Sequence, residues 1–97
     1  MNAEKLAHSA DNDRQAPDDI APELHAMWLA RNGQWDKAHD LCQKIPGSAG
    51  SWIHAWLHRQ EGDYGNACYW YSRAGKPAPA ADASLDDEWL GIVESLI

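Results

Sequence analysis

The chain contains an internal repeat with a period of 29 residues. A shift of this length aligns similar residues, in the pairs His25/His54, Ala26/Ala55, Gly33/Gly62, Trp35/Tyr64 and Ala38/Ala67. A small residue lets two helices approach closely, and glycine ends a helix in a tight turn. We expect the aromatic residue two positions after each glycine to fill the corner of a helical hairpin. Repeated helical hairpins stack on one another, so the repeat predicts an all-α fold.

The composition favours the same fold class. The chain has six Trp but no Phe, a single Val and no Thr. β-Branched residues are common in strands, and their scarcity argues against a β-rich fold. Periodicity, capping residues and a breaker cluster at 46–50 predict helices over residues 22–32, 35–44, 52–60, 64–73 and 84–97. We expect Ser51, Asp63 and Ser84 as N-terminal caps and Gly75 as a left-handed C-terminal cap.

The predicted helices divide the chain into four segments. These are an acidic, mobile arm (1–21), two helical hairpins (22–74), a Pro/Ala linker (75–83) and a C-terminal amphipathic helix (84–97). The arm has too few apolar side chains to offset the entropy lost on ordering. We expect the last helix to cover residues 52–56 and 64–71, either in its own chain or in a second copy.

The second hairpin carries a recognisable pattern. Its positions are Ala55, Gly62, Tyr64, Ala67, Tyr71, Ala74 and Pro77. This pattern resembles the tetratricopeptide repeat family, over residues 22–77 of this chain. The stretch 52–75 is also similar to one found in small uncharacterised proteins, a likeness that implies no activity. The period differs from the family's, which is about 34 residues, and Pro22 and Ser51 stand where the family has a large aromatic residue.

Charge and hydropathy narrow the classes of partner. The formal net charge is −7, yet residues 24–76 carry +2 between acidic flanks of −4 and −5. Without a basic stripe we expect no nucleic-acid partner, and without a long apolar run no membrane contact. The first residues lack the basic and apolar regions of a secretory signal, so we expect a cytoplasmic protein.

Several polar and aromatic side chains are candidates for partner binding. We expect a groove between the first helices of the two hairpins, with His25, His54, His58 and Arg59 as polar contacts. A partly exposed surface of aromatic and arginine side chains is the other candidate, formed by Trp52, Arg59, Tyr69 and Arg73.

A metal site is the competing interpretation of the histidines. His54 and His58 are four residues apart, the spacing of a metal pair on one helical face. A site needs three or four ligands, and Glu61 is expected to lie off that face. The histidines therefore favour a packing role, with each imidazole bonded to a neighbouring carbonyl group. Cys42 and Cys68 are expected to be small buried hydrophobic residues.

The sequence predicts an interaction module that binds a peptide or protein surface. The sequence has no nucleophile motif, no paired carboxylates within an apolar run and no phosphate-binding loop, so we expect no catalysis and no cofactor. Two alternatives stay open: a small-molecule or metal-binding protein that uses the His54/His58 face, and a purely structural homodimer.

Overall fold

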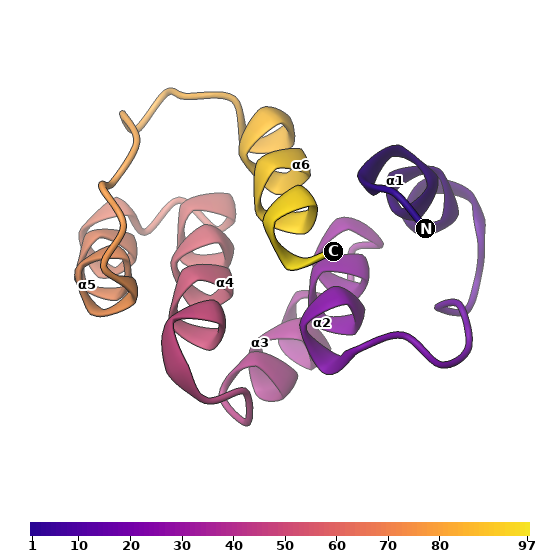
Figure 1. Cartoon of the computed structure of the whole chain (residues 1–97). Helices are drawn as coiled ribbons and strands as arrows, with labels where there is room; N and C mark the ends of the chain where they lie inside the picture. Colours follow the sequence, from indigo (N-terminus) through magenta and orange to yellow (C-terminus); the bar gives the residue numbers. More distant parts are fainter.

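The computed structural model describes residues 1–97 and is all-helical, with no strand (Figure 1). The helices are α1 (Ala3–Asn12), α2 (Pro22–Arg31), α3 (Trp35–Cys42), α4 (Gly47–Gln60), α5 (Tyr64–Ala74) and α6 (Leu85–Leu96). The all-α prediction is therefore confirmed. None of the helices combines the length and the apolar character that a membrane span requires.

Local capping chemistry places several of the helix ends as the sequence predicts. The Asp63 side chain accepts a hydrogen bond from the backbone N–H of Asn66 at the start of α5. Ser84 does the same for α6, through the N–H of Asp87. Gly75 ends α5 in the left-handed conformation, at φ 69°. Such caps bond backbone groups that helix ends leave unpaired.

Helix α4 begins earlier than the sequence predicts. It starts at Gly47, within the segment expected to break the helix, and runs for 14 residues. Gly47 turns the chain at φ 78°, and Gly50 then packs against the preceding loop. A Cβ atom at Gly50 would stand 2.1 Å from the carbonyl oxygen of Ile45. The glycines here allow a tight entry into the helix.

Two helical hairpins form the body of the molecule. Helix α2 packs on α3, and α4 packs on α5. The four alanines that the repeat aligns are fully buried, as expected of close-contact positions: Ala26, Ala38, Ala55 and Ala67. The corner aromatics behave differently from one another. Trp35 is half-buried and bonds to α4, whereas Tyr64 is 36 % exposed and donates its hydroxyl to Pro79 O in the linker.

The expectation of a mobile arm over residues 1–21 is wrong for its first half. Residues 3–12 form α1, and Leu6 is fully buried in the main core. The Trp28 indole donates a hydrogen bond to Ser9 Oγ, 3.0 Å away. Arg31, at the end of α2, pairs with both Asp11 of α1 and Asp86 of α6. The acidic flanks thus fold against basic and aromatic side chains of the middle segment.

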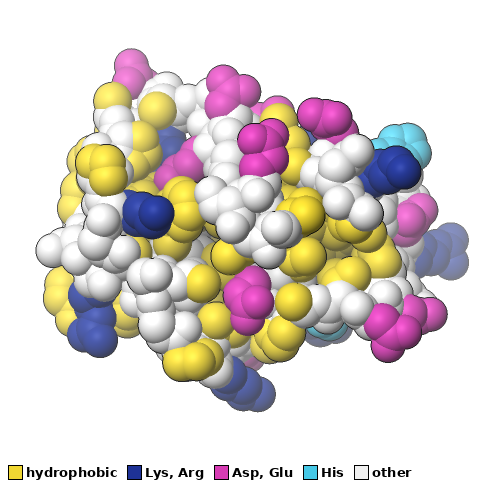
Figure 2. All heavy atoms as spheres, in the orientation of Figure 1, with side chains coloured by type: hydrophobic (Ala, Val, Ile, Leu, Met, Phe, Trp, Pro, Cys, Tyr) yellow, Lys and Arg dark blue, Asp and Glu magenta, His cyan; other side chains and the backbone are white.

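Helix α6 lies only partly where predicted. It contacts α4 at Trp56 and α5 at Tyr71, as expected, but it also packs on α1 and α2 of its own chain, between the two hairpins (Figure 1). Its buried face consists of Trp89, Ile92 and Val93. On the face drawn in Figure 2, acidic side chains gather along the upper edge, over the linker and α6. The helix therefore completes the core between the hairpins.

Candidate functional site

Helices α3 and α4 bring three histidines together on the side of α4 that faces α3. His39 comes from α3, and His54 and His58 come from α4. Their ring nitrogens lie within 4.8 Å of one another, and Nε2 of His39 is 2.9 Å from Nε2 of His54. We call these three residues the histidine cluster. The imidazole of His54 thus meets another imidazole where a carbonyl group was expected.

Local structure explains how the histidine cluster forms. His54 and His58 are one helical turn apart, so their rings share a face and stack at 4.8 Å. His39 is one turn after Trp35 on α3, and its ring stacks on that indole with centroids 4.8 Å apart. The indole N–H of Trp35 donates to Leu57 O of α4, 2.9 Å away. This bond joins α3 to α4 and places the third histidine.

Glu61 also belongs to this site, contrary to the sequence prediction. Its Oε1 is 2.6 Å from Nδ1 of His58. Glu61 is the C-terminal cap of α4, and its backbone is still in the right-handed helical region, at φ −82° and ψ −2°. Residues three positions apart lie on the same helical face, so the carboxylate reaches the imidazole. The spacing alone therefore predicts this contact, and the expectation that Glu61 lies off the face is wrong.

The environment of His54 keeps its imidazole neutral. The ring is buried and stacks on the indole of Trp70, with centroids 3.8 Å apart and planes inclined by 13°. Burial, followed by repulsion from His39 and His58, lowers the pKa of His54 to about 4. Because a protonated imidazole there would lose hydration without gaining a carboxylate partner, the neutral form is favoured.

A cleft of about 500 Å³ includes His54 and lies beside the N-terminal half of α4. One wall is the turn between α3 and α4, and the other is α5. The polar and aromatic side chains that line it include Ser48, Ser51, His54, Trp70 and Arg73. Since Gly50 admits no side chain, the turn lies close against the helix at the floor of this cleft.

The outer face of α5 carries an aromatic and arginine surface beside the cleft. The Arg73 guanidinium lies 5.3 Å from the ring centre of Trp70 and 5.8 Å from that of Tyr69. Arg73 also donates a hydrogen bond to the Tyr69 hydroxyl at 3.1 Å. Tyr69 is 54 % exposed. We call Tyr69, Trp70 and Arg73 the α5 aromatic surface.

Not every predicted site residue lies in these two places. His25 lies on α2 and lines a separate hollow with residues 14–20, so it does not join the histidine cluster. Trp52 is half-buried and packs against both the main hydrophobic core and a smaller cluster formed by Ala55, Ala67 and Tyr71. The Lys76 ammonium lies 4.4 Å from its ring centre. His54, His58, Tyr69 and Arg73 do lie at or beside the histidine cluster and the cleft.

Arg59 is inside the molecule, contrary to its expected place on an exposed surface. It is 7 % exposed, its Nη1 pairs with Glu88 of α6, and its Nη2 donates a hydrogen bond to Ala83 O. The Tyr71 hydroxyl donates to the same Glu88 carboxylate. Burial, with the bond to Glu88, raises the pKa of Tyr71, so this hydroxyl stays protonated. Arg59 therefore holds α6 on α4 and α5.

Cys42 takes the structural role expected of it. It is buried, and its thiol donates to His39 O at 3.2 Å. Burial raises the pKa of the Cys42 thiol to about 12, so the thiol is neutral near pH 7. A thiol must be deprotonated to act as a nucleophile or metal ligand. Cys42 is thus a buried, neutral thiol that bonds to the backbone beside His39. Cys68 is only half-buried.

The arrangement offers two kinds of chemistry. The three imidazoles of the histidine cluster can hold a metal ion, and Glu61 bonds to the imidazole of His58. The α5 aromatic surface and the cleft can hold a segment of another molecule. Sequence reasoning missed His39, whose one local signal is its position four residues after Trp35. Comparisons with protein-family models, with curated proteins and with solved structures give no match to this chain.

Proposed function

We propose that this chain is a small interaction module of tetratricopeptide-like type that binds a peptide or protein surface and has no catalytic role. Two consecutive hairpins, α2/α3 and α4/α5, support the resemblance to that family. So does the burial of the repeated alanines at their contacts. In such a module each hairpin contributes one helix to an inner face and one to an outer face.

The inner face is not the surface proposed for the partner. Helix α6 already packs on α2 and α4, the first helices of the two hairpins. The indole of Trp56 donates to Leu85 O at 3.0 Å, and Arg59 pairs with Glu88. These contacts fill the groove in which a partner was expected to bind. The proposed partner site is therefore the outer side, at the α5 aromatic surface.

The α5 aromatic surface, next to a cleft of about 500 Å³, carries the proposal. Tyrosine, tryptophan and arginine are the residue types most often dominant in binding energy at interfaces. Arg73 forms no ion pair within the chain, so its charge is free to meet a carboxylate. The proposed partner is a protein segment with an acidic side chain beside an apolar one.

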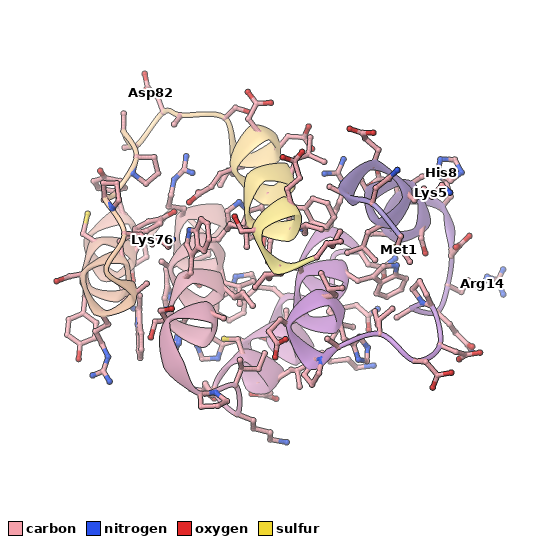
Figure 3. The ribbon with its side chains drawn as sticks, viewed as in Figure 1. Met1, Lys5, His8, Arg14, Lys76 and Asp82 are labelled. Carbon is pink, nitrogen blue, oxygen red and sulfur yellow. The ribbon has the colours of Figure 1, made fainter.

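The test compares two exposed arginines on different parts of the molecule. Arg73→Glu reverses the charge of the α5 aromatic surface, and Arg14→Glu is the matched control near the N-terminal end (Figure 3). Affinity capture with quantitative mass spectrometry is expected to give partners with the unaltered chain and with Arg14→Glu, but not with Arg73→Glu. Equal capture by all three chains contradicts the proposal.

Self-association is checked on the same three chains. A monomer has a mass of 10.8 kDa, which light scattering after size exclusion chromatography measures. A mass twice this value that falls to 10.8 kDa in Arg73→Glu identifies the partner as a second copy bound at this surface. A dimer that persists in Arg73→Glu assigns the contact to another surface and counts against the α5 aromatic surface as the site of self-association.

A further inference from the structure

We infer that His39, His54 and His58 bind one divalent transition-metal ion of the zinc type. Zinc–nitrogen bonds are about 2.0–2.1 Å long, so two imidazole nitrogens of a tetrahedral site lie about 3.3–3.4 Å apart. Nε2 of His39 and Nε2 of His54 are 2.9 Å apart and share a hydrogen bond in the metal-free chain, and all three ligand atoms lie within 4.8 Å. An ion replaces this hydrogen bond once the donor ring carries its proton on Nδ1, and small movements of the side chains then bring the three nitrogens to equal distance from the ion.

Glu61 supplies the contact that orients a metal-binding histidine. Its carboxylate lies 2.6 Å from Nδ1 of His58 and accepts the proton that this nitrogen carries. Nε2 of His58 is then left with a free lone pair, which is what a metal ion needs. A carboxylate behind a histidine ligand fixes its tautomer and makes the ring more basic. Glu61 is thus a positioning residue and does not touch the metal.

The other two imidazoles are held by aromatic rings. Trp35 stacks on His39, and Trp70 stacks on His54. Stacking restricts both rings to small movements about these positions, so little side-chain order is lost when an ion binds. The site is therefore largely formed in the folded chain.

Three protein ligands leave one tetrahedral position open. Structural zinc sites close all four positions with side chains, whereas sites that bind water or an exogenous ligand keep one free. The Cys42 thiol donates a hydrogen bond to the carbonyl oxygen of His39 and is not among the converging ligand atoms. His54 also lines the cleft, which holds Ser51, Trp70 and Arg73. Water or a small anion can reach the histidine cluster from there.

The test adds zinc chloride to the full, metal-free chain and follows binding by native mass spectrometry and calorimetry. One zinc ion per chain is expected. His39→Gln removes the least buried of the three ligands and is expected to weaken zinc binding at least tenfold. His8→Gln and His25→Gln each remove an imidazole outside the cluster, and both are expected to bind zinc as the unaltered chain does. His8 projects from α1, at the opposite end of the molecule from Lys76 (Figure 3).

Glu61→Gln tests the positioning role separately. Loss of such a carboxylate weakens metal binding by roughly 10- to 100-fold, while one zinc ion per chain is retained. The absorption spectrum of the cobalt(II) form adds a readout of geometry, since four-coordinate cobalt absorbs visible light much more strongly than six-coordinate cobalt. A weak six-coordinate spectrum contradicts a tetrahedral site.

A further measurement needs no variant and keeps the inference testable if His39→Gln does not fold. Nitrogen NMR of the unaltered chain follows the ring nitrogens of all five histidines during zinc addition. Shifts confined to His39, His54 and His58 support the site. No binding, equal binding by His39→Gln, or shifts at His8 or His25 alone overturn it. None of these outcomes depends on whether Arg73→Glu loses a protein partner.

Discussion

The indole N–H of Trp89 donates a hydrogen bond to the carbonyl oxygen of Met27, 2.9 Å away and 62 residues earlier in the chain. Both residues are fully buried, and the Arg31 guanidinium lies 4.8 Å from the centre of the Trp89 ring. This contact joins α6 to α2 through the centre of the main hydrophobic cluster. The last helix is therefore part of the core that it was expected only to cover.

Removing the Trp89 side chain is expected to destabilise the protein strongly. Trp89→Ala loses a fully buried ring together with its hydrogen bond to Met27 O, and such truncations cost about 3–5 kcal/mol. Urea unfolding followed by circular dichroism measures the change. Glu94→Ala, on the exposed side of the same helix, is the control and is expected to change stability by less than about 0.5 kcal/mol. Similar midpoints for both variants would show that α6 is not part of the core.

Helix α1 is expected to contribute to global stability. Leu6 is fully buried, so Leu6→Ala should lower the free energy of unfolding by about 2–5 kcal/mol. Lys5→Ala changes the neighbouring exposed position and should leave stability nearly unchanged. The comparison uses the same urea transition. If Leu6→Ala also leaves it unchanged, residues 3–12 behave as the mobile arm that the composition suggests.

Two glycines within helices should respond to alanine in opposite directions. At Gly50 a Cβ atom would lie 2.1 Å from a backbone oxygen, so Gly50→Ala should destabilise by about 1–3 kcal/mol. At Gly65 no atom lies within 4 Å of the new Cβ, and alanine there should stabilise by about 0.5–1 kcal/mol. Thermal melts of the two variants measure both effects. A Gly50→Ala variant as stable as the unaltered chain would exclude the tight turn before α4.

Stability should fall as the pH drops below the ordinary pKa of histidine. Above pH 6.5 the His54 ring is neutral in both the folded and the unfolded chain. Between pH 6.5 and about 4 the unfolded chain takes up a proton that the folded chain excludes, because the folded pKa is about 4. Each unit of pKa difference is worth about 1.4 kcal/mol, so the loss approaches about 3 kcal/mol.

Urea unfolding at several pH values, with a chelator present, isolates this effect. His54→Gln removes the group and should flatten the slope of stability against pH between 6.5 and 4. His8→Gln, on the exposed side of α1, should retain the full slope. Equal slopes for the unaltered chain and His54→Gln would place the acid sensitivity in other groups, such as the carboxylates.

Features set by residues near one another in the chain were predicted well. Asp63 and Ser84 cap their helices, and Gly75 turns left-handed after α5, because each acts on backbone within four residues of itself. The burial of the repeated alanines follows from periodicity in the same way. On α5, three consecutive aromatics cannot all face one core, and accordingly Tyr69 is exposed while Tyr71 is buried.

Features that depend on partners far along the chain were missed. His39 meets His54 because α3 packs against α4, a contact that includes the bond from Trp35 to Leu57 O and shared core residues. The repeat relates His25 to His54, yet His25 lies beside the segment at 14–20 and has no second imidazole against it. Equivalent positions in a repeat thus acquire different surroundings when the units before and after them differ.

Signals local to the sequence predict an all-α fold, the hairpins at residues 22–74, the caps at Asp63, Gly75 and Ser84, and the alanine contacts. These depend on backbone propensity and helical periodicity, which act over a few residues. The tertiary structure decided that α1 and α6 share one core with the hairpins, that Arg31 gathers Asp11 and Asp86, and that three histidines converge. Burial of apolar surface and pairing of charge depend on which segments meet in space, and a helical period carries no information about that.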